Sequence, residues 1–93
     1  MVVGTLRVRM LVREARSLKD KRQVVRGIID RLRHRYNISI GEVGARDDPR
    51  RVELGAAAVG AEATPVRTAL EQVREDLRRH PTAEYLGGEL EIL

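Results

Sequence analysis

The order of two hydrophobic periodicities along the chain constrains the fold more than any other feature. Four segments place apolar side chains at every second position, which is typical of β-strands. These are residues 2–12, 37–43, 51–60 and 83–93. Two further segments, residues 17–35 and 64–80, repeat apolar side chains at steps of three and four, which is typical of amphipathic helices. The predicted order is therefore β-α-β-β-α-β.

Each predicted strand has only one apolar side, so both helices must cover the same face of the sheet. This predicts an α+β fold, the ferredoxin-like β-α-β-β-α-β sandwich, with two helices on one face of a four-stranded antiparallel sheet. No linker or repeat interrupts the chain, and we expect a single domain over residues 1–93. The first and last strands are then neighbours, and cross-strand ion pairs are expected among Arg7, Arg9, Glu89 and Glu91.

Capping residues mark the ends of the two predicted helices. Ser17 is a good N-cap, and Asp20 three residues later completes a start similar to a capping box. The second helix is expected to begin with Thr64 as its cap and Pro65 at its first position, and to stop before Pro81.

The composition excludes several classes of protein. The absence of Cys excludes a disulfide framework, a thiolate nucleophile and a thiolate-ligated metal, and it fits a reducing cytoplasm. No apolar run approaches the roughly 20 residues that a membrane-spanning helix needs, and there is no signal-peptide pattern. We therefore expect a soluble, cytoplasmic protein with no membrane partner. Its Arg-rich composition, with a single Asn, indicates either a thermophile or a GC-rich genome as the source.

Residues suited to catalysis or metal binding are scarce. His34 and His80 each lie at the basic end of a predicted helix, where a histidine usually complements the helix dipole. Ser17 serves as a cap, and no cluster of His, Asp and Glu has the spacing of metal ligands. Asp47 and Asp48 precede a proline and indicate an ordinary turn. We predict a non-catalytic protein with no metal and no cofactor.

Positive charge is concentrated in the first half of the chain. Residues 1–46 contain 12 Lys and Arg against 4 Asp and Glu, a net charge of +8. Residues 47–93 contain 6 against 10, a net charge of −4. This asymmetry indicates either an anionic partner or charge complementarity between the two halves.

One side of the first predicted helix carries much of this charge. Lys19, Arg22, Arg26 and Arg33 fall within about 60° of one another at about 100° per residue. Lys21 lies beside the cap, where free N–H groups of the first helical turn favour phosphate. We predict that these five residues form an RNA/phosphate-binding site that contacts phosphates without reading bases.

Two alternatives remain open for this basic helix. In the first, the helix binds no partner, and its charges are either exposed to solvent or paired with Glu71, Glu75 or Asp76 of the second predicted helix. In the second, the helix binds an acidic protein in place of RNA.

The sheet face without helices is a second candidate surface. The outward positions of the third strand carry no aromatic ring, which excludes base stacking there. Val3, Val43, Ala57 and Val59 are expected to form a flat, small apolar patch on this face, as is typical of self-association. The alternative function is therefore a protein-interaction module, or a homodimeric scaffold or sensor, that uses this face.

Three motifs are distributed along the chain. They are Ser17-Leu18-Lys19-Asp20-Lys21-Arg22, Ile38-Ser39-Ile40-Gly41-Glu42-Val43-Gly44 and the terminal Glu89-Leu90-Glu91-Ile92-Leu93. Together they resemble the YlxP-like family, bacterial domain of unknown function 503. The resemblance covers essentially the whole chain and implies a cytoplasmic ferredoxin-like domain with no established catalytic residue. Members are encoded in many bacteria near genes for translation initiation and ribosome maturation, which implies ribosomal RNA or an acidic translation-associated protein as partner.

Overall fold

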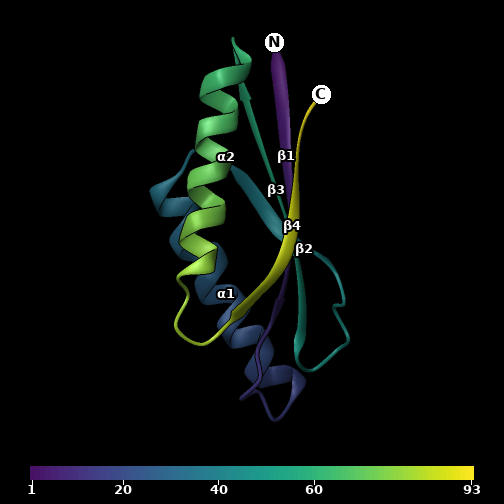
Figure 1. Ribbon diagram of the computed structural model, residues 1–93. Helices are drawn as coiled ribbons and strands as arrows, with labels where there is room; N and C mark the ends of the chain where they lie inside the picture. Colours follow the sequence, from purple (N-terminus) through teal and green to yellow (C-terminus); the bar gives the residue numbers. More distant parts are fainter.

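Four strands and two helices follow one another in the predicted order. The computed structural model describes residues 1–93. The elements are β1 (Val2–Leu11), α1 (Leu18–Arg35), β2 (Ser39–Gly44), β3 (Arg51–Gly60), α2 (Ala63–Arg78) and β4 (Glu84–Ile92). The strands form one sheet in the order β2-β3-β1-β4, and all neighbours are antiparallel. Both helices lie on one side of this sheet (Figure 1), which confirms the ferredoxin-like sandwich.

The core lies between the helices and the sheet. Alternate residues of β1 and β3 point into it, because successive side chains of a strand project to opposite faces. Each helix buries four residues at steps of three and four, and all but one of these are apolar. They are Lys21, Val25, Ile28 and Leu32 of α1 and Val66, Leu70, Val73 and Leu77 of α2.

The predicted helix starts are right for α1 and wrong by two residues for α2. Ser17 caps α1, and its hydroxyl accepts a hydrogen bond from the Asp20 N–H at 3.1 Å. Helix α2 starts at Ala63 behind Glu62, whose side chain makes no capping bond. Thr64 and Pro65 therefore lie inside the first turn, where proline is tolerated because the N–H groups of that turn have no partner within the helix.

Two irregularities modify the edge strands. The register between β2 and β3 shifts between Glu42 and Gly44, which leaves Val43 as the additional residue of a bulge. The register between β1 and β4 shifts between Arg9 and Met10, which leaves Leu86 as the additional residue of a bulge next to Gly87. Strand β4 continues through Gly87 and Gly88 to Ile92.

The two helices cover different parts of the sheet. Helix α1 packs against β2, whereas α2 packs against β1, β3 and β4. The start of α1 and the β2–β3 loop lie toward the end of the molecule opposite the two termini (Figure 1). Neither helix has the length and apolar character required to traverse a bilayer.

Candidate nucleic-acid interface

Three of the five residues predicted to bind phosphate form an exposed stripe on α1. We call Lys19, Arg22 and Arg26 the basic flank. Their side chains are exposed, and none of them makes an ion pair or a side-chain hydrogen bond. Helical steps of three and four place them on one side of α1. The flank is therefore a row of positive charges that the protein itself does not neutralise.

Lys21 does not belong to this surface, which corrects the sequence prediction. Its side chain is 0% exposed. Its ammonium group donates hydrogen bonds to the carbonyls of Ala45 at 2.8 Å and Arg51 at 3.0 Å, and it lies 3.1 Å from the Glu42 carboxylate. The carbonyl of Arg46 lies further away, at 3.5 Å. Lys21 consequently cannot reach an RNA phosphate.

The sequence does contain a signal for the burial of Lys21. Lys21 precedes Val25, Ile28 and Leu32 at steps of four, three and four, so it occupies the buried stripe of α1. Glu42 follows Ile40 by two residues and pairs with the buried Leu54, so it faces the same interior. The spacing therefore indicates a buried basic residue opposite a largely covered acidic residue, which a count of charges does not reveal.

Arg33 combines exposure with a structural contact. One guanidinium nitrogen donates a hydrogen bond of 3.1 Å to the carbonyl of Ile40 on β2. Because β2 is an edge strand, this contact occupies a main-chain acceptor that another strand could otherwise pair with. The basic flank therefore lies on the side of α1 nearest this edge, and the partly engaged Arg33 lies beyond its C-terminal end.

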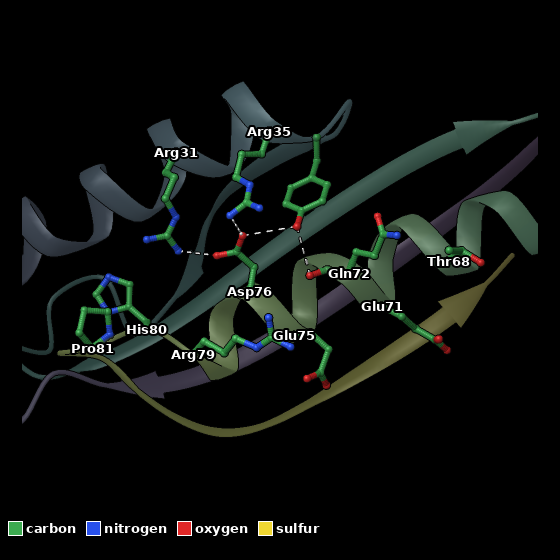
Figure 2. Close-up of a pocket in the computed structure, with 11 residues that line it drawn as sticks. Arg31, Arg35, Thr68, Glu71, Gln72, Glu75, Asp76, Arg79, His80 and Pro81 are labelled. Carbon is green, nitrogen blue, oxygen red and sulfur yellow. Dashed lines mark hydrogen bonds and ion pairs between the residues drawn. The ribbon is translucent and has the colours of Figure 1, made fainter.

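The opposite side of α1 is neutralised by α2. Figure 2 shows Arg31 and Arg35 directed at Asp76, with ion-pair distances of 2.6 and 3.0 Å, while the Tyr36 hydroxyl donates to the same carboxylate at 3.4 Å. Glu75 pairs instead with Arg78 of its own helix. The predicted neutralisation by α2 thus applies to Arg31 and Arg35, and it leaves the basic flank untouched.

A polar cleft of about 570 Å³ separates the C-terminal halves of the two helices. His80 lines this cleft, and its Nδ1 accepts hydrogen bonds from the N–H groups of Thr82 and Ala83 at 3.2 and 3.0 Å. Burial, and then the positive charge of Arg31, lower the pKa of His80 below its ordinary value. His80 thus closes the α2–β4 loop through its ring nitrogen Nδ1.

The open sheet face holds the predicted apolar patch. Val3 pairs with Val59 and Thr5 pairs with Ala57, while Val43 packs over Gly55. Val43 and Val59 remain 53% and 64% exposed. A hollow of about 770 Å³ lies on this face over the small residues of β2 and β3.

The ion pairs at the border of this face differ from the expected ones. Arg9 makes a bidentate pair with Glu89 at 2.8 and 2.9 Å, and Arg7 reaches Glu53 on the other side at 3.4 Å. The strand twist brings diagonal neighbours within reach of long side chains, so Arg9 pairs diagonally although Glu89 stands opposite Arg7. The hydrogen bond from Arg9 lowers the pKa of Glu89. Glu91 makes no ion pair.

The loop between β2 and β3 is an ordinary turn, as the paired aspartates predict. The Asp48 carboxylate accepts hydrogen bonds from the N–H groups of Arg50 at 2.9 Å and Arg51 at 2.8 Å. The hydrogen bond from Arg51, followed by that from Arg50, lowers the pKa of Asp48. No three His, Asp or Glu side chains come together as metal ligands.

Comparisons with known proteins assign the chain to a family. A family model described as protein of unknown function (DUF503) matches residues 3–89. The chain is also 30% identical over 83 residues to the uncharacterized protein YlxP of Bacillus subtilis (strain 168). That alignment covers 89% of this chain and 90% of the relative. Neither description assigns an activity or a ligand.

Proposed function

Because the chain belongs to the DUF503 family of unknown function, we propose from its own surface that it is a non-catalytic protein that binds RNA phosphates through the basic flank. The observation that carries this proposal is the exposure of Lys19, Arg22 and Arg26 without a partner, beside a helix side whose arginines are paired. Ribosomal RNA is the class of RNA that the gene context of the family implies.

Repulsion among the charges of the basic flank destabilises α1, which supports binding of an anionic ligand there. Like charges three or four residues apart on a helix repel each other by roughly 0.2–0.5 kcal/mol per pair. Lys19 and Arg22 are such a pair, and so are Arg22 and Arg26. At a rise of about 1.5 Å per residue, the three charges lie along about 10 Å of the helix axis, so they can contact successive phosphates of one strand. An anionic backbone would relieve this repulsion.

The arrangement supports backbone binding and not base recognition. The protein has two aromatic residues, and both face the helix side of the sheet. Tyr36 is engaged with Asp76, and the ring of Tyr85 lies 4.9 Å from the guanidinium carbon of Arg78. No aromatic ring is therefore available on the open sheet face for stacking bases. Contacts to phosphates alone carry no sequence information.

A matched pair of charge reversals tests this proposal. Arg22 on α1 and Arg67 on α2 are both exposed, and neither makes an ion pair, so Arg22→Glu and Arg67→Glu change the net charge equally. Affinity is measured by fluorescence anisotropy with a single-stranded RNA of about 16 nucleotides. We expect Arg22→Glu to weaken binding about tenfold at low salt, which corresponds to one lost phosphate contact at about 50 mM salt. An equal loss of RNA affinity in the two variants would contradict specific binding at the basic flank.

An acidic protein partner is the competing outcome of the same test. In that case the chain retains a protein from cell lysate after nuclease treatment, and the RNA anisotropy does not change with protein concentration. Salt alone does not separate the two partners, because both would bind through charge.

The exposed valines of the open face favour a second candidate function, self-association. This face carries both Arg7 and the unpaired Glu91, so a second copy related by a two-fold axis presents complementary charges around the same apolar patch. Sedimentation equilibrium tests this: we expect a dimer for the native protein and a monomer for Val59→Arg. A monomer for the native protein at high concentration would refute it.

A further inference from the structure

The β2–β3 loop is fixed against the start of α1, although the two segments are distant in the sequence. Lys21 donates to the carbonyls of Ala45 and Arg51, at the two ends of the loop. The Arg50 Nε donates to the carbonyl of Ala15 at 3.2 Å, and the Val12 N–H donates to the carbonyl of Arg50 at 2.8 Å. The loop is thus held on both sides by segment 12–21.

These contacts determine which groups of the loop face outward. The carbonyls of Ala45 and Arg51 point to the buried ammonium of Lys21, while Ala45 itself adopts the left-handed conformation with φ 54°. The side chains of Arg46 and Arg50 are left exposed, and neither makes an ion pair. Two guanidinium groups therefore lie on the loop that packs against the first turn of α1, where the basic flank begins.

The acidic residues of this region are largely engaged with the main chain. The Asp48 carboxylate accepts from two N–H groups of its own loop. The Asp20 carboxylate accepts from the Arg16 N–H at 3.0 Å. Asp47 is exposed and makes no ion pair. Arg46 and Arg50 are thus not neutralised by a specific contact.

We infer that the phosphate-binding surface continues from the basic flank onto the β2–β3 loop, where Arg46 and Arg50 supply two further phosphate contacts. This inference rests on the proposed function of the basic flank and defines how far the phosphate-binding surface extends. The ligand is an RNA backbone that passes from the side of α1 across its N-terminal end. Arg51 is excluded from this surface, because it stands opposite Leu11 and points to the open sheet face.

The salt dependence of RNA binding measures the extent of this surface. The logarithm of the binding constant falls with the logarithm of the salt concentration by about 0.7 for each phosphate contact to a single strand. Three contacts from the flank alone predict a slope of about −2, and five contacts predict about −3.5. The two cases are therefore distinguishable in one titration series.

The experiment compares the native protein with four variants, using the same single-stranded RNA. The native protein is expected to give a slope near −3.5 and the double variant Arg46→Ala, Arg50→Ala a slope near −2. Arg46→Lys with Arg50→Lys keeps both charges and should retain the native slope, although it loses the contact of the Arg50 Nε with Ala15. Arg51→Ala should also retain it.

Three outcomes would overturn the inference. A native slope near −2, or an unchanged slope in the double alanine variant, would confine binding to the flank and leave the proposed function intact. A loss in the lysine variant equal to that in the alanine variant would assign a structural role to the two arginines. Arg46→Ala alone covers the case of a misfolded double variant, because the Arg46 side chain makes no hydrogen bond, and it should reduce the slope by about 0.7.

Discussion

The ammonium group of Lys21 lies 3.1 Å from the carboxylate of Glu42, between α1 and the edge strand β2, with the Lys21 side chain fully buried and that of Glu42 14% exposed. Burial of two charges is costly, and their attraction compensates for it only when further hydrogen bonds satisfy both groups. The carbonyls of Ala45 and Arg51 provide such bonds for Lys21. The pair therefore attaches the β2–β3 loop to α1 and is a structural element of the domain.

Replacement of Lys21 by methionine should be strongly destabilising. It leaves a buried carboxylate and two carbonyls without their donor, and we expect a loss of about 3–5 kcal/mol in the free energy of unfolding. Urea denaturation followed by circular dichroism measures this loss. The double variant Lys21→Met, Glu42→Leu should recover part of it, because it removes the unpaired charge. A single variant as stable as the native protein would mean that the pair contributes nothing.

Two glycines of the sheet should respond oppositely to alanine. A Cβ atom at Gly88 would lie 2.7 Å from the carbonyl oxygen of Arg7, so the two strands would have to separate. We expect Gly88→Ala to cost about 1–3 kcal/mol, as overpacking usually does. A Cβ atom at Gly41 would meet nothing within 4 Å, so Gly41→Ala should leave the unfolding midpoint unchanged or slightly raised. Equal midpoints for the two variants would contradict the close approach of β1 and β4.

His80 should make the stability depend on pH below neutrality. Its pKa in the folded protein lies below its ordinary value of about 6.5, so the unfolded chain binds the proton more readily. The contribution of His80 is therefore fully present above about pH 6.5 and is lost as the pH falls through the folded pKa. Protonation of Nδ1 would also remove the acceptor for the N–H groups of Thr82 and Ala83.

Unfolding midpoints between about pH 8 and pH 5 check this prediction. The variant His80→Asn keeps an acceptor oxygen but cannot titrate in this range, and its midpoint should vary less with pH than that of the native protein. Identical pH profiles for the two proteins would show that His80 does not contribute.

The fold could be predicted from the sequence because each strand is apolar on one side only. The alternation along β1 and β3 determines which face is buried, and the helical spacing of Val25, Ile28 and Leu32 determines which side of α1 meets that face. The start of α2 was predicted two residues late, since Thr64 and Pro65 are equally compatible with the interior of a first turn.

The candidate site was less predictable, because charge patterns on one helix do not identify the partners on another element. Asp76 engages Arg31 and Arg35, while Glu42 and Ile40 of β2 engage Lys21 and Arg33. The helical spacing of Lys21 indicates that it is buried, but these pairings depend on the tertiary structure. The five predicted cations therefore separate into three free ones, one partly engaged and one buried. The contribution of the β2–β3 loop was not apparent for the same reason.

Binding of RNA to the flank is best tested by the triple variant Lys19→Glu, Arg22→Glu, Arg26→Glu. The three side chains make no intramolecular ion pair, so the far-ultraviolet circular dichroism and the unfolding midpoint should stay close to those of the native protein. The measurement is the affinity for single-stranded RNA at about 50 mM salt. We expect native binding that weakens steeply as salt increases and no detectable binding by the folded triple variant. Native affinity in the triple variant would contradict phosphate binding by α1.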